Sequence, residues 1–221
     1  MHIVDTGDWP ATTAEALAVQ DRLRGRVDFT DACPELPPTV TGLDVAYGEH
    51  RIAAAVVTLE TGTFRVVEER TVSAAPAFPY EPGLFAFREL PPLLEALGRL
   101  AHPPDVLVCD GHGLAHPRRF GLACHLGVLT GLPAFGVGKT RFVGEHAEPA
   151  RERGSSAPLT ESGEVVGAVL RTQDDVKPVY VSVGHRIGLE HACRLTLALS
   201  PRFRLPETTR QADQLSRAAL R

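Results

Sequence analysis

Hydrophobic and polar residues alternate along this chain first at a helical spacing and then at a strand spacing. Residues 10–26 bring apolar side chains to one side of a helix that begins near a proline. After an irregular connection at residues 27–38, three segments are rich in β-forming residues: 39–47, 51–59 and 63–72. The polar gaps between them are three residues long, which is typical of hairpins. We therefore expect a three-stranded antiparallel meander whose partly polar third strand forms an edge.

Helices and strands alternate in the rest of the chain. A helical period covers residues 84–100, after a proline-rich loop at residues 73–83. The continuous apolar segment 106–109 is typical of a strand buried on both faces of a parallel sheet. Further segments follow in order: a helix at 118–130, strands near 134–136, at 164–171 and at 178–183, and helices at 188–199 and 207–220. The pattern predicts an α/β fold with one mixed sheet, three antiparallel strands followed by parallel strands, flanked by helices.

Composition favours one globular domain over residues 1–221, with an N-terminal helix and connection at 1–38 and a polar surface loop at 144–163. Hydrophobic residues make up 43% of the chain and charged residues 23%, which excludes a disordered protein. No apolar segment has the roughly 20 residues that a membrane span needs. Four cysteines without CxxC spacing, and an N-terminus without a secretory signal, favour a cytoplasmic protein with free thiols.

The formal net charge of −4 is unevenly distributed. The first 38 residues hold seven acidic and three basic residues, so the remainder of the chain is formally neutral. Residues 202–221 carry five arginines against two acidic residues. Local clusters of this kind can bind a polyanion, because the potential at the contact face matters more than the net charge. Charge alone therefore leaves the partner open.

Three carboxylates have positions that suggest a common site. Asp44 lies inside an apolar strand, Asp110 closes the strand at 106–109, and Glu89 lies in the helical segment between them. Taken singly, each has a structural explanation. Asp44 could be a hydrogen-bonded buried aspartate, Asp110 a turn-forming aspartate before glycine, and Glu89 a solvated helix residue. The two strands would be neighbours in the expected sheet, however, so the three acids would meet. Clustered acids repel one another unless a divalent cation is bound, and oxygen ligands suit Mg²⁺ or Mn²⁺, so the group predicts metal-assisted phosphoryl chemistry.

A series of short motifs follows the order found in a known nuclease family. They are Gly42-Leu43-Asp44-Val45, Pro79-Tyr80-Glu81-Pro82-Gly83-Leu84, Phe87-Arg88-Glu89, Asp110-Gly111-His112-Gly113, His116-Pro117-Arg118-Arg119, Gly136-Val137-Gly138-Lys139, Gly184-His185-Arg186 and Leu205-Pro206-Glu207-Thr208-Thr209-Arg210 with Ala212-Asp213. In these motifs the chain resembles endonuclease V, a deoxyinosine-directed repair nuclease, from about residue 10 to its end. The combination of the DGHG…HPRR and PYxPG blocks is the most specific part of the resemblance.

The resemblance implies a fold, a reaction and a set of catalytic residues. The fold is an RNase H-like mixed sheet. The reaction is hydrolysis of the second phosphodiester bond 3′ to deoxyinosine in DNA, which leaves 3′-hydroxyl and 5′-phosphate ends and uses Mg²⁺, or Mn²⁺ in its place. Asp44 and Asp110 match the metal ligands, and Glu89 matches the third acid. Lys139 matches a catalytic lysine, and Asp213 matches a C-terminal position where the family carries His or Asp.

The same resemblance assigns residues to DNA recognition. A wedge loop that fills the space left by an extruded base is matched by Pro79, Tyr80, Glu81 and Pro82. Tyr80 is the tip of this wedge, and Glu81 makes it more polar than is common in the family. The expected hypoxanthine pocket consists of Gly83, Phe85, Gly111, Gly113, His116 and Gly121. The candidate phosphate contacts are Arg118, Arg119, Arg141 and Arg210.

Two inosine-directed alternatives to a DNA repair enzyme stay open at this point, and a weaker third is a Holliday-junction or RNA/DNA-hybrid nuclease on the same fold. The chain could be an inosine-specific endoribonuclease, because some relatives prefer RNA. It could also be a non-catalytic module that binds inosine or other damage, although the complete set of acids argues against this. For the repair enzyme and the two inosine-directed alternatives, the expected partner is a nucleic acid containing inosine, bound by a monomer without any membrane association.

Overall fold

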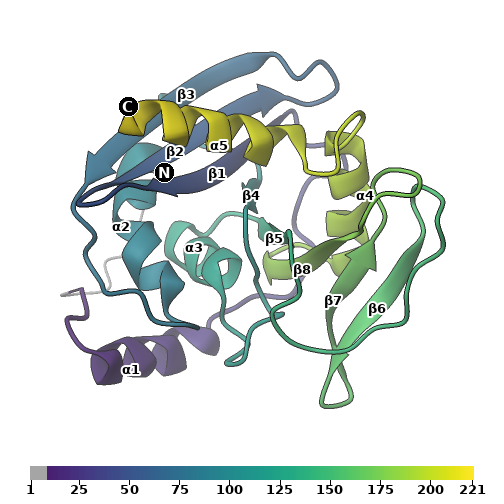
Figure 1. Ribbon diagram of the computed structural model, residues 1–221, viewed down its shortest axis with the longest axis horizontal. Coiled ribbons are helices and arrows are strands. Elements are labelled where there is room, and N and C mark those ends of the chain that lie inside the picture. The colour runs from purple at the N-terminus through teal and green to yellow at the C-terminus, as the bar shows by residue number, and fades with distance from the viewer. Residues whose placement is uncertain (1–8) are drawn as a thin grey trace.

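The computed structural model describes residues 9–221, and a single eight-stranded mixed sheet lies at the centre of this part of the chain (Figure 1). Across the sheet the strand order is β3-β2-β1-β4-β5-β8-β7-β6. The strands are β1 (Thr39–Tyr47), β2 (Ile52–Glu60), β3 (Val66–Ala74), β4 (Leu107–Cys109), β5 (Ala134–Gly138), β6 (Ser156–Glu161), β7 (Glu164–Leu170) and β8 (Val179–His185). The helices are α1 (Thr13–Arg24), α2 (Phe85–Gly98), α3 (Leu122–Thr130), α4 (Leu189–Leu199) and α5 (Glu207–Leu220).

The strand directions confirm the predicted fold class. β1, β2 and β3 pair antiparallel, and β3 forms the edge of the sheet as expected. β4 pairs parallel to β1, and β5 pairs parallel to β4. β8, β7 and β6 then continue the sheet with antiparallel pairs. The parallel part is therefore confined to β1, β4 and β5, and the carboxyl ends of these three strands lie at the same end of the sheet.

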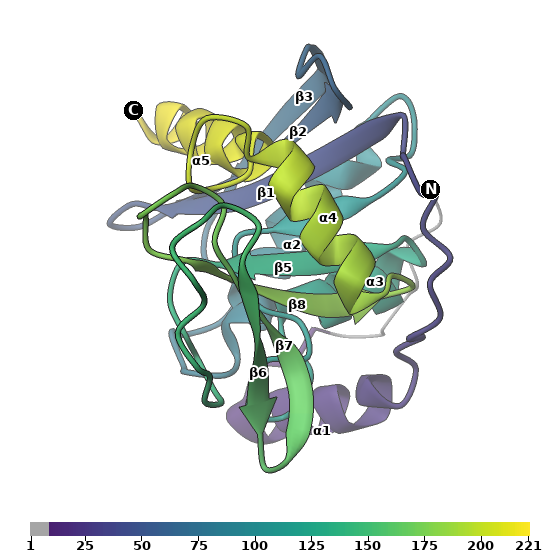
Figure 2. The same cartoon turned by 90° about the vertical axis from the view of Figure 1, so that its right-hand side faces the viewer.

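Helices cover both faces of the sheet. Successive strand side chains point to opposite faces, so the continuous apolar strands need to be buried on both sides. On one face, Leu43 and Cys109 pack in a common core with residues of α2 and α3. On the opposite face, Val108 and Phe135 pack with residues of α4, and α5 packs on β1 and β2. Figure 2 shows α4 crossing in front of β5 and β8. None of the described helices is long and apolar enough to cross a membrane.

The prediction of a surface loop over residues 144–163 is wrong for the second half of that range, where β6 forms. Ala157 and Leu159 are buried on one side of β6, which pairs with β7 through a tight turn. Both turn residues, Ser162 and Gly163, have positive φ. Only two apolar residues separated by a proline mark this strand, and that alternation is too weak to predict it.

The helix expected from residue 118 begins instead at Leu122. Arg119 has a φ of 55°, a left-handed conformation that cannot be part of a right-handed helix. The segment between Asp110 and Leu122 is therefore an irregular loop at the end of β4.

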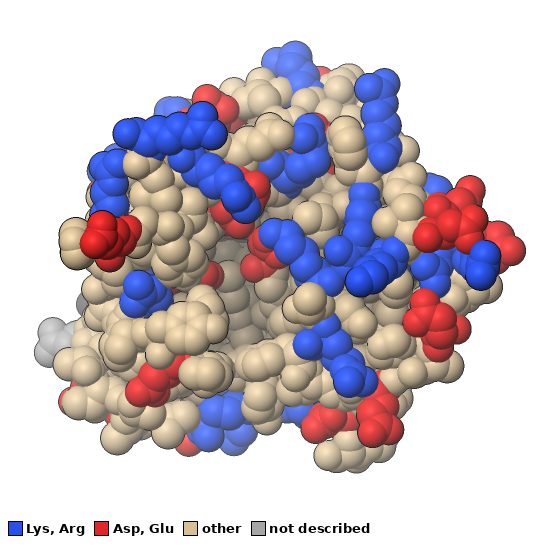
Figure 3. Space-filling view, in the orientation of Figure 1, with Lys and Arg blue, Asp and Glu red and all other residues tan. Residues whose placement is uncertain are grey.

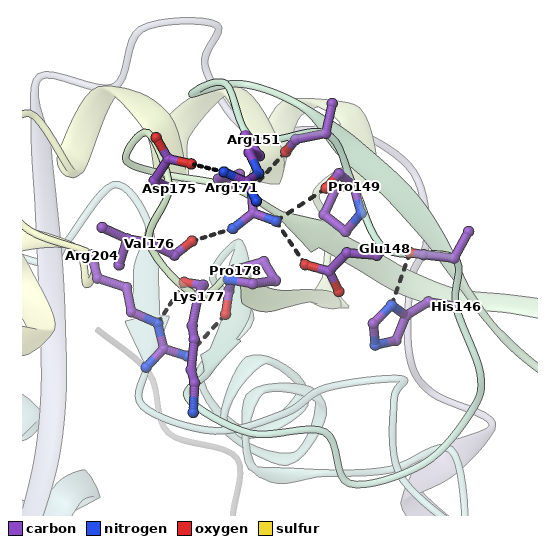
Figure 4. Close-up of polar contacts among 12 residues, drawn as sticks. His146, Glu148, Pro149, Arg151, Arg171, Asp175, Val176, Lys177, Pro178 and Arg204 are labelled. Carbon is purple, nitrogen blue, oxygen red and sulfur yellow. Dashed lines mark hydrogen bonds and ion pairs between the residues drawn. The ribbon is translucent and has the colours of Figure 1, made fainter.

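The first half of the expected loop, residues 144–155, has no helix or strand but is fastened to the end of β7 (Figure 4). Arg171, whose side chain is only 7% exposed, donates hydrogen bonds to this segment. Its Nη2 contacts Glu148 Oε1 at 2.7 Å and Pro149 O at 3.0 Å, and its Nε contacts Ala150 O at 2.6 Å. A buried guanidinium is tolerated because its donors are paired, so these bonds hold the segment against the sheet.

Candidate active site

The three parallel strands bring charged residues to one end of the sheet. Asp44 follows Leu43 in β1, and Asp110 follows Cys109, the last residue of β4. Leu43 and Cys109 are register partners, and the Asp110 amide donates to Leu43 O at 3.4 Å. Lys139 directly follows β5, the next strand. The sheet therefore places the two candidate metal ligands on neighbouring strands, as the sequence predicts, and the candidate catalytic lysine at the end of the next strand.

Lys139 forms an ion pair with Asp110. Burial alone would lower the pKa of the Lys139 ammonium. The hydrogen bond to Asp110 and the charges of Asp44 and Asp213 outweigh burial, so the pKa of Lys139 is raised. The lysine therefore stays protonated and carries a fixed positive charge beside the acids.

Arg204 fixes the main chain at this lysine. Its Nη2 donates to Lys139 O at 2.5 Å and to Pro178 O at 2.9 Å, and its Nε donates to Lys177 O at 2.9 Å. Figure 4 shows the Arg204 side chain beside Lys177 and Pro178. One guanidinium thus ties the end of β5 to the start of β8. The motifs give no sign of this role, because it depends on backbone carbonyls from two distant segments.

Glu89 reaches the same place from α2. The Tyr47 hydroxyl, at the end of β1, donates a hydrogen bond to Glu89 Oε1. Burial raises the pKa of Glu89 to about 7, and the charges of Asp44 and Asp110 act in the same direction. The hydrogen bond from Tyr47 and the charge of Arg88 lower that pKa in part. At neutral pH this carboxyl group is therefore poised to bind or to release a proton.

Helix α5 supplies the fourth acid and a hydrogen-bond donor. Asp213 and Ser216 lie three residues apart, and Ser216 Oγ donates to Asp44 Oδ2 at 2.6 Å. The helix comes this close because β1 has Gly42 at the crossing. A Cβ on Gly42 would lie 2.3 Å from the carbonyl carbon of Thr208. Sequence reasoning missed Ser216, although its spacing from Asp213 is that of one helix face.

The five residues expected to be catalytic line one cleft of about 640 Å³: Asp44, Glu89, Asp110, Lys139 and Asp213. Burial raises the pKa of Asp44 to about 6, the hydrogen bond from Ser216 lowers it, and the charges of Asp110 and Asp213 raise it. Figure 3 shows acidic atoms inside a central hollow, with lysines and arginines around it. A negative floor with a positive surround suits a cation together with a polyanion.

The donors in this cleft fit a hard divalent cation held by two carboxylates. Within residues 9–221, no three His, Cys, Asp or Glu side chains converge into a ligand group of their own. Mg²⁺ is usually held by only one or two carboxylates, together with water and phosphate oxygens. Asp44 and Asp110 meet that requirement, and a cation there would relieve the repulsion that contributes to the raised pKa of Asp44.

A second hollow, of about 360 Å³, opens beside the acids, since Glu89 and Asp110 also line it. Five of the six residues expected in the base pocket line this hollow: Gly83, Phe85, Gly111, His116 and Gly121. His112, Thr140 and Phe142 line it as well, and the motifs did not assign them to the pocket. The second hollow therefore borders the acidic cleft and is lined largely by uncharged groups.

His116 is held as a neutral imidazole in this hollow. Burial lowers the pKa of His116 to about 4. Its Nδ1 accepts a hydrogen bond from the Arg118 amide at 3.1 Å, so Nε2 carries the proton and donates to Gly83 O at 3.1 Å. The ring is therefore fixed in one tautomer at the wall of the hollow.

The structure places Gly113 away from this hollow. Its amide donates to Ser182 Oγ at 2.8 Å, and a Cβ on Gly113 would lie 2.0 Å from Val183 O. The glycine is needed because the loop after β4 packs directly against the main chain of β8. Its position indicates a packing role.

The expected wedge loop projects beside the second hollow. Tyr80 is 65% exposed, and its ring centre lies 4.7 Å from that of Phe85, edge to face. The Thr13 hydroxyl donates one hydrogen bond that is shared between the two carboxylate oxygens of Glu81, at 2.8 Å and 2.9 Å, which ties the loop to α1. The polar wedge residue thus has a partner within the protein, and the aromatic tip packs on Phe85 while most of its surface stays exposed.

The four candidate phosphate contacts differ in their surroundings. Three of them form ion pairs: Arg118 with Asp21 at 2.6 Å, Arg119 with Glu164 at 2.9 Å and Arg210 with Glu207 at 2.7 Å. Arg141 lines the second hollow. By position, Arg141 is therefore the strongest candidate of the four for a phosphate next to the base.

Comparisons with known proteins extend over nearly the whole chain. A family profile described as Endonuclease V matches residues 21–214. The endonuclease V of Streptomyces coelicolor is 58% identical, over 96% of this chain and 93% of that protein. A crystal structure of endonuclease V from Streptomyces avermitilis has a TM-score of 0.93 and 54% identity, and the match covers 100% of this chain and 98% of that one. Endonuclease V of Ciona intestinalis, solved with a 24mer DNA containing an inosine followed by a ribo-adenosine, has a TM-score of 0.81 and 27% identity, with 94% and 97% covered.

Proposed function

Because the chain belongs to the endonuclease V family, we propose that it is a repair enzyme that nicks DNA near deoxyinosine. The cut falls at the second phosphodiester bond 3′ to the lesion and leaves 3′-hydroxyl and 5′-phosphate ends. A family member of this kind is a nuclease, a hydrolase of phosphodiester bonds. The observation that carries the proposal is the acidic cleft with Lys139, which opens directly beside a second hollow suited to a base.

We propose Mg²⁺ as the metal of this nuclease, with Mn²⁺ as a substitute, held by Asp44 and Asp110. When bound, such a metal supplies a Lewis acid for the phosphate and lowers the pKa of water. The support for this choice is the oxygen-only donor set, because Mg²⁺ and Mn²⁺ prefer carboxylates.

The protein's own side chains then have distinct tasks. Lys139 places a fixed positive charge where negative charge develops on the phosphate oxygens, held by Asp110 and by the bond from Arg204 to its carbonyl. Glu89 lines the same cleft as Asp44 and Asp110, so its carboxylate is placed to take a proton from the attacking water. Asp213 adds a further carboxylate that orients water on the α5 side of the cleft.

Recognition would use the second hollow and the wedge. An inosine base extruded from the stack would enter the hollow between His116 and Phe85. The Tyr80 ring, exposed at the rim, would stack in the space that the base leaves. Arg141, in the same lining, would contact a phosphate beside the extruded nucleotide.

We propose that the protein acts as a monomer. We expect it to act in the cytoplasm, where it can reach the cell's DNA. All five candidate catalytic residues come from one chain and line one cleft, so a second copy is not needed to complete the site.

The test is a nicking assay on end-labelled duplexes with one deoxyinosine, compared with an undamaged duplex, each in Mg²⁺ and in EDTA. We expect a Mg²⁺-dependent nick at the second bond 3′ to deoxyinosine and none in the control. No nick in any arm, with a gel shift on the deoxyinosine duplex, would mean that the protein binds the lesion without cutting.

Inosine in RNA is a second candidate substrate. The observation that favours it is the Ciona intestinalis complex, whose DNA carries a ribo-adenosine directly after the inosine. A single-stranded RNA with one inosine is therefore added to the assay. Cleavage of this RNA without cleavage of the DNA would move the function to inosine-containing RNA.

A further inference from the structure

Tyr47 is a phenol at the edge of the acidic cleft to which no motif assigns a role. It is the last residue of β1, three positions after Asp44, and it lines the same cleft as the five candidate catalytic residues. Its hydroxyl donates a hydrogen bond to Glu89 Oε1. A strand of the sheet and the helix that carries the third acid are thus joined side chain to side chain at the site.

The Tyr47 ring is held from two sides. The guanidinium carbon of Arg88 lies 5.3 Å from the ring centre, a cation–π contact. The Phe85 ring lies edge to face, with centres 6.4 Å apart and an interplanar angle of 81°. The residue is 42% exposed, so these contacts, rather than burial, fix where its hydroxyl points.

The same contacts lead from the cleft to the wedge. Phe85 lines the second hollow and also packs against the Tyr80 ring, with centres 4.7 Å apart. Tyr47, Phe85 and Tyr80 thus form a continuous row of rings from Glu89 to the loop expected to enter the DNA. Base recognition and the third acid are connected by this row.

Glu89 needs such a partner because of its neighbours. Asp44 and Asp110 repel its carboxylate, and a glutamate side chain has three rotatable bonds with which to turn away. A hydrogen bond to an ionised carboxylate is stronger than one between neutral groups. The bond engages Oε1, so Oε2 keeps its capacity to accept a proton or a further hydrogen bond.

We propose that Tyr47 is a positioning residue whose hydroxyl holds the Glu89 carboxylate in the cleft for reaction with water. The proposal rests on the nuclease function proposed above. It predicts that loss of the hydroxyl slows the chemical step but leaves DNA binding intact, because the ring and its contacts with Phe85 and Arg88 remain.

The first experiment compares Tyr47→Phe with the wild type on the deoxyinosine duplex. We expect the single-turnover cleavage rate in Mg²⁺ to fall about 10- to 100-fold, the usual cost of a misplaced reacting group. The Kd for the duplex in EDTA should stay within about twofold, since binding does not use the hydroxyl. The matched control is Tyr180→Phe, which removes a hydroxyl that contacts His146 at 3.3 Å outside the cleft and should leave both values unchanged.

The second experiment tests the contact without relying on activity. Urea unfolding in EDTA is measured for Tyr47→Phe, Glu89→Ala and the double variant, since alanine leaves no side-chain acceptor for the Tyr47 hydroxyl. We expect the two effects on unfolding free energy to be less than additive, because either substitution removes the same hydrogen bond to a carboxylate.

The outcomes separate the two proposals. A wild-type cleavage rate in Tyr47→Phe, a loss confined to duplex affinity, or additive unfolding energies would each overturn the role of Tyr47. A wild-type protein that does not cut the deoxyinosine duplex would instead overturn the nuclease proposal, and the unfolding cycle would still decide whether the hydroxyl holds Glu89.

Discussion

At the scale of single residues, the cleft is held in an electrostatically unfavourable state. Burial and mutual repulsion raise the pKa of Asp44 to about 6 and that of Glu89 to about 7. Within this acidic group, Lys139 forms an ion pair with Asp110. The repulsion between these carboxylates lowers the stability of the fold, and it favours binding of a cation that would relieve it.

Asp44→Asn should therefore stabilise the metal-free protein. A carboxyl group whose pKa is raised on folding destabilises the fold once the pH exceeds its unfolded value, and this cost is complete above its folded value of about 6. Asparagine removes the charge and keeps an oxygen that can accept the Ser216 hydrogen bond. We expect a gain of about 1–2 kcal/mol, reduced from the full shift because Asp44 is partly solvated.

The measurement is urea unfolding in EDTA at pH 4 and pH 8. The difference between Asp44→Asn and wild type should be near zero at pH 4 and largest at pH 8. A difference that is larger at pH 4, or a variant that is less stable at pH 8, contradicts the view that the Asp44 charge is destabilising.

At the scale of elements, the site depends on how closely α5 lies on β1. Gly42 allows the contact, and α5 then delivers Asp213 to the cleft and Ser216 to Asp44. The wedge loop is similarly built from its neighbours, through the rings of Tyr80 and Phe85 and the bond from Thr13 to Glu81.

Gly42→Ala should damage both stability and catalysis. The added Cβ would lie 2.3 Å from the Thr208 carbonyl carbon, so α5 must shift away from β1. We expect a loss of about 2 kcal/mol or more in unfolding free energy, as for overpacked cores, and a reduced cleavage rate. The control is Gly25→Ala, where φ is −69° and an added Cβ would meet nothing within 4 Å. Equal effects of the two substitutions would rule out the close packing of α5 as the cause.

Tyr80→Ala should weaken recognition of the lesion. Loss of one stacking ring typically costs about 1–3 kcal/mol per base, so the Kd for the deoxyinosine duplex in EDTA should rise about 5- to 150-fold. Binding of an undamaged duplex should change little. If affinity falls equally for both duplexes, Tyr80 is a general DNA contact rather than a wedge.

Much of this arrangement could be predicted from the sequence, and the rest follows from packing. Asp44 and Asp110 were expected to meet because their strands are sheet neighbours, and the register of β1 with β4 bears this out. The family resemblance drawn from the motifs is confirmed by the comparisons. Ser216 was missed although it has the spacing of one helix face with Asp213. The contacts of Tyr47 and Arg204 could not be predicted, because they depend on the packing of α2 and of the loop before α5.

At the scale of the whole molecule, the site gathers residues from nearly the full length of the chain, from Asp44 to Asp213. The antiparallel meander lies on one side of β4, and the strands from β5 to β6 lie on the other. The cleft forms at the carboxyl ends of the parallel strands between these halves. The net charge of −4 does not prevent DNA binding, because the lysines and arginines gather around this hollow in Figure 3.

The decisive measurement for the proposed metal site is the single-turnover cleavage of a deoxyinosine duplex by Asp110→Asn in Mg²⁺, with duplex binding in EDTA as the companion measurement. Asp110 forms an ion pair with Lys139, and Asp110 and Asp44 are the two proposed metal ligands. We expect cleavage to fall by at least about 1,000-fold while the duplex is still bound. Cleavage at the wild-type rate would contradict the assignment of this cleft as the metal-dependent active site.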